Sequence, residues 1–170
     1  MNILPSCWLG NQFDTADRLS LPYFEDLLRD LFNEHADPNQ CEVYNKLQTM
    51  EQKILLRKIA LSRRQAARFW VKAARYYTRI DQPSASFEAY DLCSRVLDRR
   101  ELCALFMLHS EWAAVAHSLG FDAQTDQSYE YVMRYANELA RIPDSGIQAN
   151  EDNPVYLEAI KWRSTRTDSE

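Results

Sequence analysis

The sequence predicts an all-α fold built from antiparallel helical hairpins. Apolar residues recur at intervals of three and four along most of the chain, which is the period of a helix with one buried face. Capping residues and prolines stand where these runs begin or end. No stretch alternates apolar and polar residues for long enough to form a sheet. The chain has 170 residues, of which 46% are apolar and 26% charged, so it can bury a substantial core.

Seven helices are expected, or six if the break before Ser62 is only a bend. Their expected ranges are 20–37, 39–61, 62–80, 84–97, 101–119, 125–142 and 153–163. Residues 1–19 lack a helical period and are predicted to form an N-terminal arm. Residues 20–163 then make a single all-helical domain, and residues 164–170 a polar tail.

Local signals fix several helix ends. Ser62 and Gln65 have the spacing of a capping box, and Gly120 stands where a left-handed residue ends a helix. Asn153, followed by a proline, has the form of a cap and first position. Thr125 or Asp126 is expected to cap the start of the helix over 125–142. The helix over 101–119 is the most apolar and should be the most buried.

The composition excludes several functional classes. Three glycines leave no material for a phosphate-binding loop. No apolar run approaches the roughly 18 residues that span a bilayer, and no secretory signal begins the chain, so a cytoplasmic protein is expected. The four cysteines form no CxxC pair and are predicted to be buried thiols. His109 and His117 lie about 12 Å apart along one helix, too far to share a metal. We therefore expect no enzyme, no cofactor and no metal.

A repeat-like spacing occurs in the middle of the chain. Its first copy comprises Trp70, Ala73, Ala74, Tyr77, Ser86, Tyr90 and Cys93. A weaker second copy comprises Trp112, Ala113, Ala116, Gly120, Thr125, Tyr129 and Val132. The distance along the chain between the two copies is longer than the period of the repeat family that the pattern resembles. This pattern resembles the tetratricopeptide (TPR) repeat over about residues 66–140. The resemblance implies a TPR-like stack of hairpins that binds a segment of another protein; the alternative architecture is an irregular helical bundle.

A rival resemblance covers overlapping residues. Residues 87–96 and 112–121, followed by Thr125, Tyr129, Tyr135 and Leu139, are similar to the core of an ARID DNA-binding domain. That resemblance implies a helix near Thr125 in the major groove. However, acidic residues stand near the proposed contact edge, where they would repel phosphate, and Arg100 and Glu101 replace the family's paired glycines. DNA binding therefore ranks second.

Charge and tyrosine patterns supply the candidate binding residues. The formal net charge is −5, yet nine basic and no acidic residues lie between Lys53 and Arg79. One expected cationic helix face comprises Arg64, Arg68, Lys72, Arg75 and Arg79, whose alternative role is an ordinary solvated surface. Tyr131 and Tyr135 lie one turn apart, away from the predicted core face. The predicted function is a non-catalytic adaptor, secretion-type chaperone or regulatory partner that binds an acidic or extended protein segment. A homodimer is a further expectation.

Overall fold

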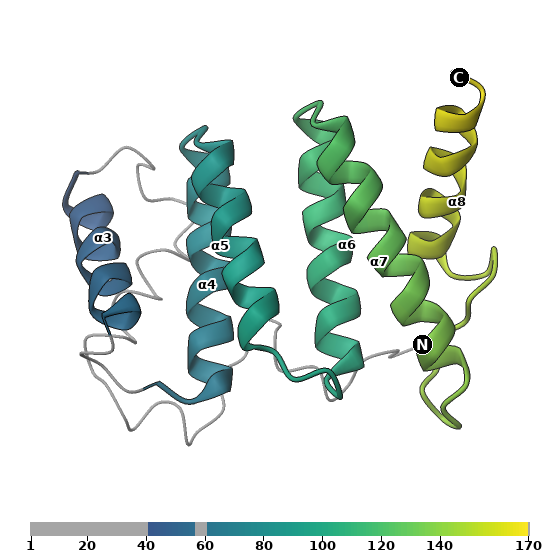
Figure 1. The fold of residues 1–170 in the computed structure, drawn as a ribbon, viewed down its shortest axis with the longest axis horizontal. Helices are drawn as coiled ribbons and strands as arrows, with labels where there is room; N and C mark the ends of the chain where they lie inside the picture. The colour runs from purple at the N-terminus through teal and green to yellow at the C-terminus, as the bar shows by residue number, and fades with distance from the viewer. Residues whose placement is uncertain (1–40, 57–60, 170) are drawn as a thin grey trace. The chain divides into compact units, whose positions relative to one another are not determined.

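The computed structural model describes residues 41–56 and 61–169, with side chains from Val43 onward. These residues form six α-helices and no strand, so the predicted all-α class is confirmed for the described part of the chain (Figure 1). The predicted N-terminal arm, the helix expected over 20–37 and residues 57–60 lie outside the described residues. The helix expected over 39–61 ends earlier than predicted, at Leu55, since neither Leu56 nor Leu61 is helical.

The described residues belong to two compact units, 41–97 and 98–169. The single domain expected over 20–163 stays a prediction. The first unit contains α3 (Cys41–Leu55), α4 (Arg63–Arg79) and α5 (Pro83–Val96). The second contains α6 (Leu102–Ser118), α7 (Asp122–Ala140) and α8 (Pro154–Thr167).

A capping box begins α4, as the sequence predicts. The Gln65 amide donates to Ser62 Oγ at 3.1 Å, and the Ser62 amide donates to Gln65 Oε1 at 2.9 Å. Each bond satisfies a backbone donor that the helix itself leaves without a partner. Ser62 therefore caps the start of a separate helix and does not mark a bend within one helix.

Small side chains let α4 and α5 pack closely as an antiparallel hairpin. Ser86 Oγ donates to the Ala74 carbonyl at 3.0 Å, and Cys93 Sγ donates to the Ala67 carbonyl at 3.2 Å. Such bonds require the two helix backbones to approach one another, which only small residues permit. All seven positions of the first repeat-like copy are buried.

The second unit is organised around the α6–α7 hairpin. Its core cluster comprises Phe106, Ala113, Tyr129, Val132, Ala136, Leu139, Ile147 and Ala159. Gly120 ends α6 with φ at +79°, the left-handed conformation predicted for it. The start predicted for the next helix is wrong by one turn: α7 begins at Asp122, and Thr125 lies inside it. The Thr125 hydroxyl donates to the Phe121 carbonyl at 2.8 Å, as threonine does within helices.

The last helix, α8, begins where the sequence predicts and ends later. The Asn153 side chain caps it by accepting from the amides of Val155 and Tyr156 at 3.1 and 3.4 Å. The helix continues to Thr167, so most of the polar tail expected after Arg163 is helical.

Two other sequence predictions concern membranes and thiols. None of the described helices is long and apolar enough to cross a lipid bilayer. Cys93 is a buried thiol and Cys103 a half-buried one, and neither forms a disulfide within the described residues.

The capping box gives the first testable prediction. Ser62→Ala removes one reciprocal hydrogen bond and should lower the free energy of unfolding by about 1 kcal/mol, measured by urea denaturation. The control is Ser84→Ala, on the exposed side of α5, which should change that free energy by less than about 0.5 kcal/mol. Equal effects of the two substitutions would contradict the capping role.

Candidate protein-binding groove

A groove of about 460 Å³ lies between α7 and α8 in the unit 98–169. From α7 it is lined by Asp126, Tyr129, Glu130, Met133, Arg134 and Asn137. From α8 it is lined by Ala159, Trp162, Arg163, Arg166 and Thr167. The α7 residues recur at three and four, so they form one stripe that extends about 16 Å along the helix axis.

The groove exists because α8 packs on α7 mainly through its first half. Ala159 is fully buried and belongs to the same core cluster as Ala136 and Leu139, near the end of α7. Figure 1 shows α7 inclined to α8, with the start of α8 near the end of α7. Beyond Ala159 the contact between the helices depends on longer side chains, which leave space between the two backbones.

Trp162 is the largest apolar side chain of the groove, and three neighbours hold it in place. Its indole Nε1–H donates to Asp126 Oδ1 at 2.6 Å. The His117 ring packs edge-on against it at 4.9 Å between centroids, and Tyr129 lies 6.4 Å away. A tryptophan whose orientation is fixed in this way offers a rigid apolar surface at little entropic cost.

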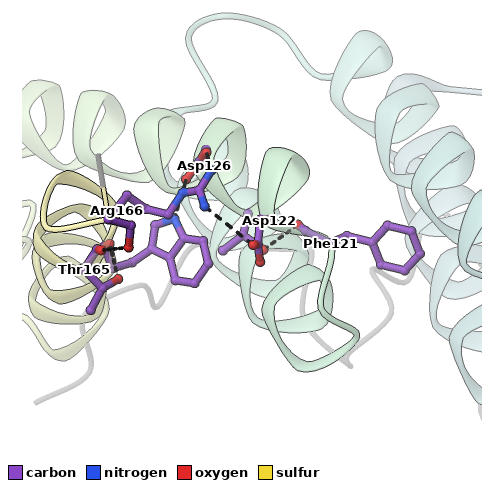
Figure 2. Close-up of polar contacts among 8 residues, drawn as sticks. Phe121, Asp122, Asp126, Thr165 and Arg166 are labelled. Atoms are coloured by element: carbon purple, nitrogen blue, oxygen red, sulfur yellow. Dashed lines mark hydrogen bonds and ion pairs between the residues drawn. The ribbon is translucent and has the colours of Figure 1, made fainter.

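Arg166 ties α8 to the start of α7 (Figure 2). Its Nε and Nη2 donate to the two carboxylate oxygens of Asp126 at 3.2 and 3.1 Å, and its Nη1 lies 3.5 Å from Asp122 Oδ2. Its guanidinium also lies 5.7 Å from the centre of the Trp162 ring. Bidentate arginine–carboxylate pairs fix geometry as well as charge. The negative charge of Asp126 is therefore locally compensated.

The rim of the groove carries further charges. Arg134, Arg163 and Glu130 are exposed, and Asn137 adds an exposed amide. Within the described residues, Arg163 makes no ion pair. An apolar floor of Tyr129, Met133 and Trp162 under a mixed polar rim is the usual character of a surface that binds a peptide.

The expected cationic face on α4 is not a continuous exposed surface. Arg64 and Arg79 are exposed and Arg75 is half-buried, but Arg68 and Lys72 retain only 1% and 2% of their exposure. All five residues take part in interactions within the chain. The helical spacing placed them on one face correctly, but α4 is buried around most of its circumference. The prediction of a basic stripe open to solvent is therefore wrong at its centre.

Tyr131 and Tyr135 lie on the side of α7 away from the groove, and both are half-buried. Their rings stack on one another at 6.0 Å and on the His109 ring of α6 at 4.6 and 5.7 Å. The Arg134 guanidinium lies 5.0 Å from the Tyr131 ring centre. These tyrosines thus help to join α6 to α7, and they belong to a different unit from the basic residues of α4.

His109 is the titratable centre of this aromatic stack. It is 4% exposed, and burial lowers its pKa from 6.5 to about 4. The imidazole is consequently neutral at physiological pH, which allows it to stack on tyrosine and on Trp112 at 5.8 Å as an aromatic ring. No group of three or more metal-ligating side chains occurs in the described part of the chain.

The groove itself is not predicted by the sequence. Trp162 falls in the helix expected over 153–163, and Tyr129 falls in the second repeat-like copy. Their meeting depends on contacts between residues 36 and 40 positions apart, such as those of Asp126 with Trp162 and Arg166. No helical period reveals such a pair. The only available signal was the continued run of arginine and hydroxyl residues after Trp162.

Searches against protein-family models, curated proteins and solved structures find no match to this chain.

The buried imidazole generates a prediction about acid stability. An unfolded chain protonates His109 below pH 6.5, whereas the folded chain resists protonation until about pH 4. This group's contribution to stability is therefore fully present above pH 6.5 and is lost as the pH falls toward 4, a change on the order of 3 kcal/mol. His109→Phe keeps a ring in the stack and should flatten urea unfolding free energies over that interval.

His117→Phe is the matched control, because His117 is exposed. It should leave the acid-dependent loss of stability as in the unsubstituted protein. A His109→Phe protein that still loses the same stability between pH 6.5 and 4 would contradict the assignment.

Proposed function

We propose that this chain is a non-catalytic protein-binding module that holds an extended, acidic segment of another protein in the α7–α8 groove. The observation that carries this proposal is the fixed Trp162 side chain on an apolar floor, bordered by arginines. The stripe of about 16 Å along α7 matches roughly five residues of an extended peptide at about 3.3 Å per residue.

The charges of the groove favour an acidic occupant. The negative charge of Asp126 is already compensated by Arg166. The remaining charges of the groove are two positive ones, on Arg134 and Arg163, and one negative one, on Glu130. An acidic side chain next to Arg163 would gain an ion pair without displacing an existing one. An apolar side chain of the same segment would cover Trp162 and Met133, and the Asn137 amide is suited to a peptide carbonyl or N–H.

The test uses fluorescently labelled heptapeptides in which glutamate alternates with leucine, and matched peptides with lysine in place of glutamate. Fluorescence anisotropy should show binding of the glutamate series to the full chain. Arg163→Glu should weaken it about tenfold, because repulsion replaces attraction at the rim. Arg163 is exposed, so the substitution should leave helical circular dichroism unchanged.

Arg141→Glu is the control for the same change of charge, since Arg141 is exposed just after α7 and does not line the groove. It should alter the affinity by less than about twofold. If it weakens binding as much as Arg163→Glu, or if the lysine peptides bind equally well, the groove is not the binding site.

DNA binding, the alternative function, can be tested separately. Thr125, expected at the start of a recognition helix, is fully buried, and Asp122 and Glu130 are exposed on the same helix. Exposed carboxylates on a helix repel phosphate. We therefore expect no specific binding of an AT-rich duplex over a GC-rich one in a titration at low and at physiological salt. Specific, steeply salt-dependent binding would favour the ARID-like alternative and contradict the ranking.

A further inference from the structure

A second pocket, of about 210 Å³, lies in the other unit, among α3, α4 and α5. Three aromatic side chains line it, namely Tyr44, Trp70 and Tyr77. Two carboxylates, Glu51 and Glu88, line it as well. The described side chains of the pocket include no basic residue, so its charged groups are all negative.

Glu51 is held in place by one strong contact. The Tyr77 hydroxyl donates to Glu51 Oε1 at 2.9 Å and accepts from Gln48 Nε2. This chain of hydrogen bonds points the carboxylate toward the tyrosine on α4 and links α3 to α4 across 26 residues of sequence. Within the described residues Glu51 and Glu88 make no ion pair.

The pocket also has an apolar end. In Figure 1, α3 and α5 run in the same direction and α4 runs against them. Leu55 and Leu92 come late in α3 and α5, while Trp70 precedes Tyr77 by two turns of α4. All three line the pocket, and along the helix axes they come on the same side of Glu51, Glu88 and Tyr77.

We propose that this pocket binds an alkylammonium group, with its charged head between Glu51 and Glu88 and its alkyl stem against Leu55, Trp70 and Leu92. Carboxylates supply the opposite charge, and aromatic faces attract a cation through the ring quadrupole. Apolar side chains accept the methylene stem that a primary amine carries. This inference concerns a different unit from the proposed peptide groove and stands whether or not that groove binds a peptide.

The acid–base behaviour of Glu51 supports the same ligand. Burial, together with the nearby charge of Glu88, raises the pKa of Glu51 to about 7, against the lowering effect of the Tyr77 hydrogen bond. The titratable or charged side chains that face it in the pocket are Tyr44, Tyr77 and Glu88. A bound cation would favour the ionised carboxylate, so binding should lower this pKa and release a proton.

The experiment follows the Trp70 indole signal of the full chain by NMR at pH 7.5. The probes are n-butylamine and Nα-acetyl-lysine methylamide, and butan-1-ol is the uncharged control. Both amines, or one of them, should shift the signal saturably. The affinity for butan-1-ol should be at least about fivefold weaker. Tighter or equal binding of the lysine derivative identifies a protein side chain as the ligand, whereas binding of butylamine alone identifies a free amine.

Glu88→Gln tests the charge without disturbing the core, because Glu88 is exposed. It should weaken amine binding about fivefold, and Glu51→Gln should do the same. Glu138→Gln, on the exposed surface of α7, is the control and should have no effect. In the unsubstituted chain, saturating amine should also lower the carboxyl carbon titration midpoint of Glu51. Equal binding of butan-1-ol, unchanged binding by Glu88→Gln, or no saturable shift would overturn the proposal.

Discussion

The close approach of paired helices is the constraint on which both units depend. In the α4–α5 hairpin, Ala67 and Ala74 expose backbone carbonyls that accept hydrogen bonds from Cys93 and Ser86. Larger side chains at these positions would push the helices apart and leave those carbonyls beyond reach. In the α6–α7 hairpin, small and β-branched residues such as Ala113 and Val132 serve the same close packing. Each hairpin can therefore bury one seam fully and leave its other faces to a third helix.

The third helix in each unit packs less completely, and this difference creates the two candidate binding sites. In the unit 98–169, α8 meets α7 through the small residue Ala159, after which Trp162 and Arg166 span the widening space. In the unit 41–97, the Tyr77 hydroxyl reaches Glu51 of α3 beside a small pocket. Long polar and aromatic side chains thus replace small ones where a third helix is added. Helical residues line both sites, and Gln82, just before α5, adds a loop residue to the smaller pocket.

Local rules explain why much of the fold could be predicted from the sequence. Ser62, Gly120 and Asn153 act on backbone groups within a few residues, so their patterns indicate helix ends directly. The helix cap predicted at Thr125 is wrong because a threonine hydroxyl can donate to a carbonyl of its own helix as readily as it can cap a helix. The groove could not be predicted, because Asp126 reaches Trp162 only through the tertiary packing of α8.

The burial of Arg68 and Lys72 shows why a run of charge in a sequence does not define a charged surface. Nine basic residues between Lys53 and Arg79 suggested a cationic face, yet the two at its centre are buried. What a partner meets depends on which charges are exposed and which are compensated nearby. Arg166 is neutralised by two aspartates, while Arg163, three residues earlier on the same helix, makes no ion pair within the described residues. The charge that a surface presents is therefore decided by these local pairings, which net charge and sequence order do not reveal.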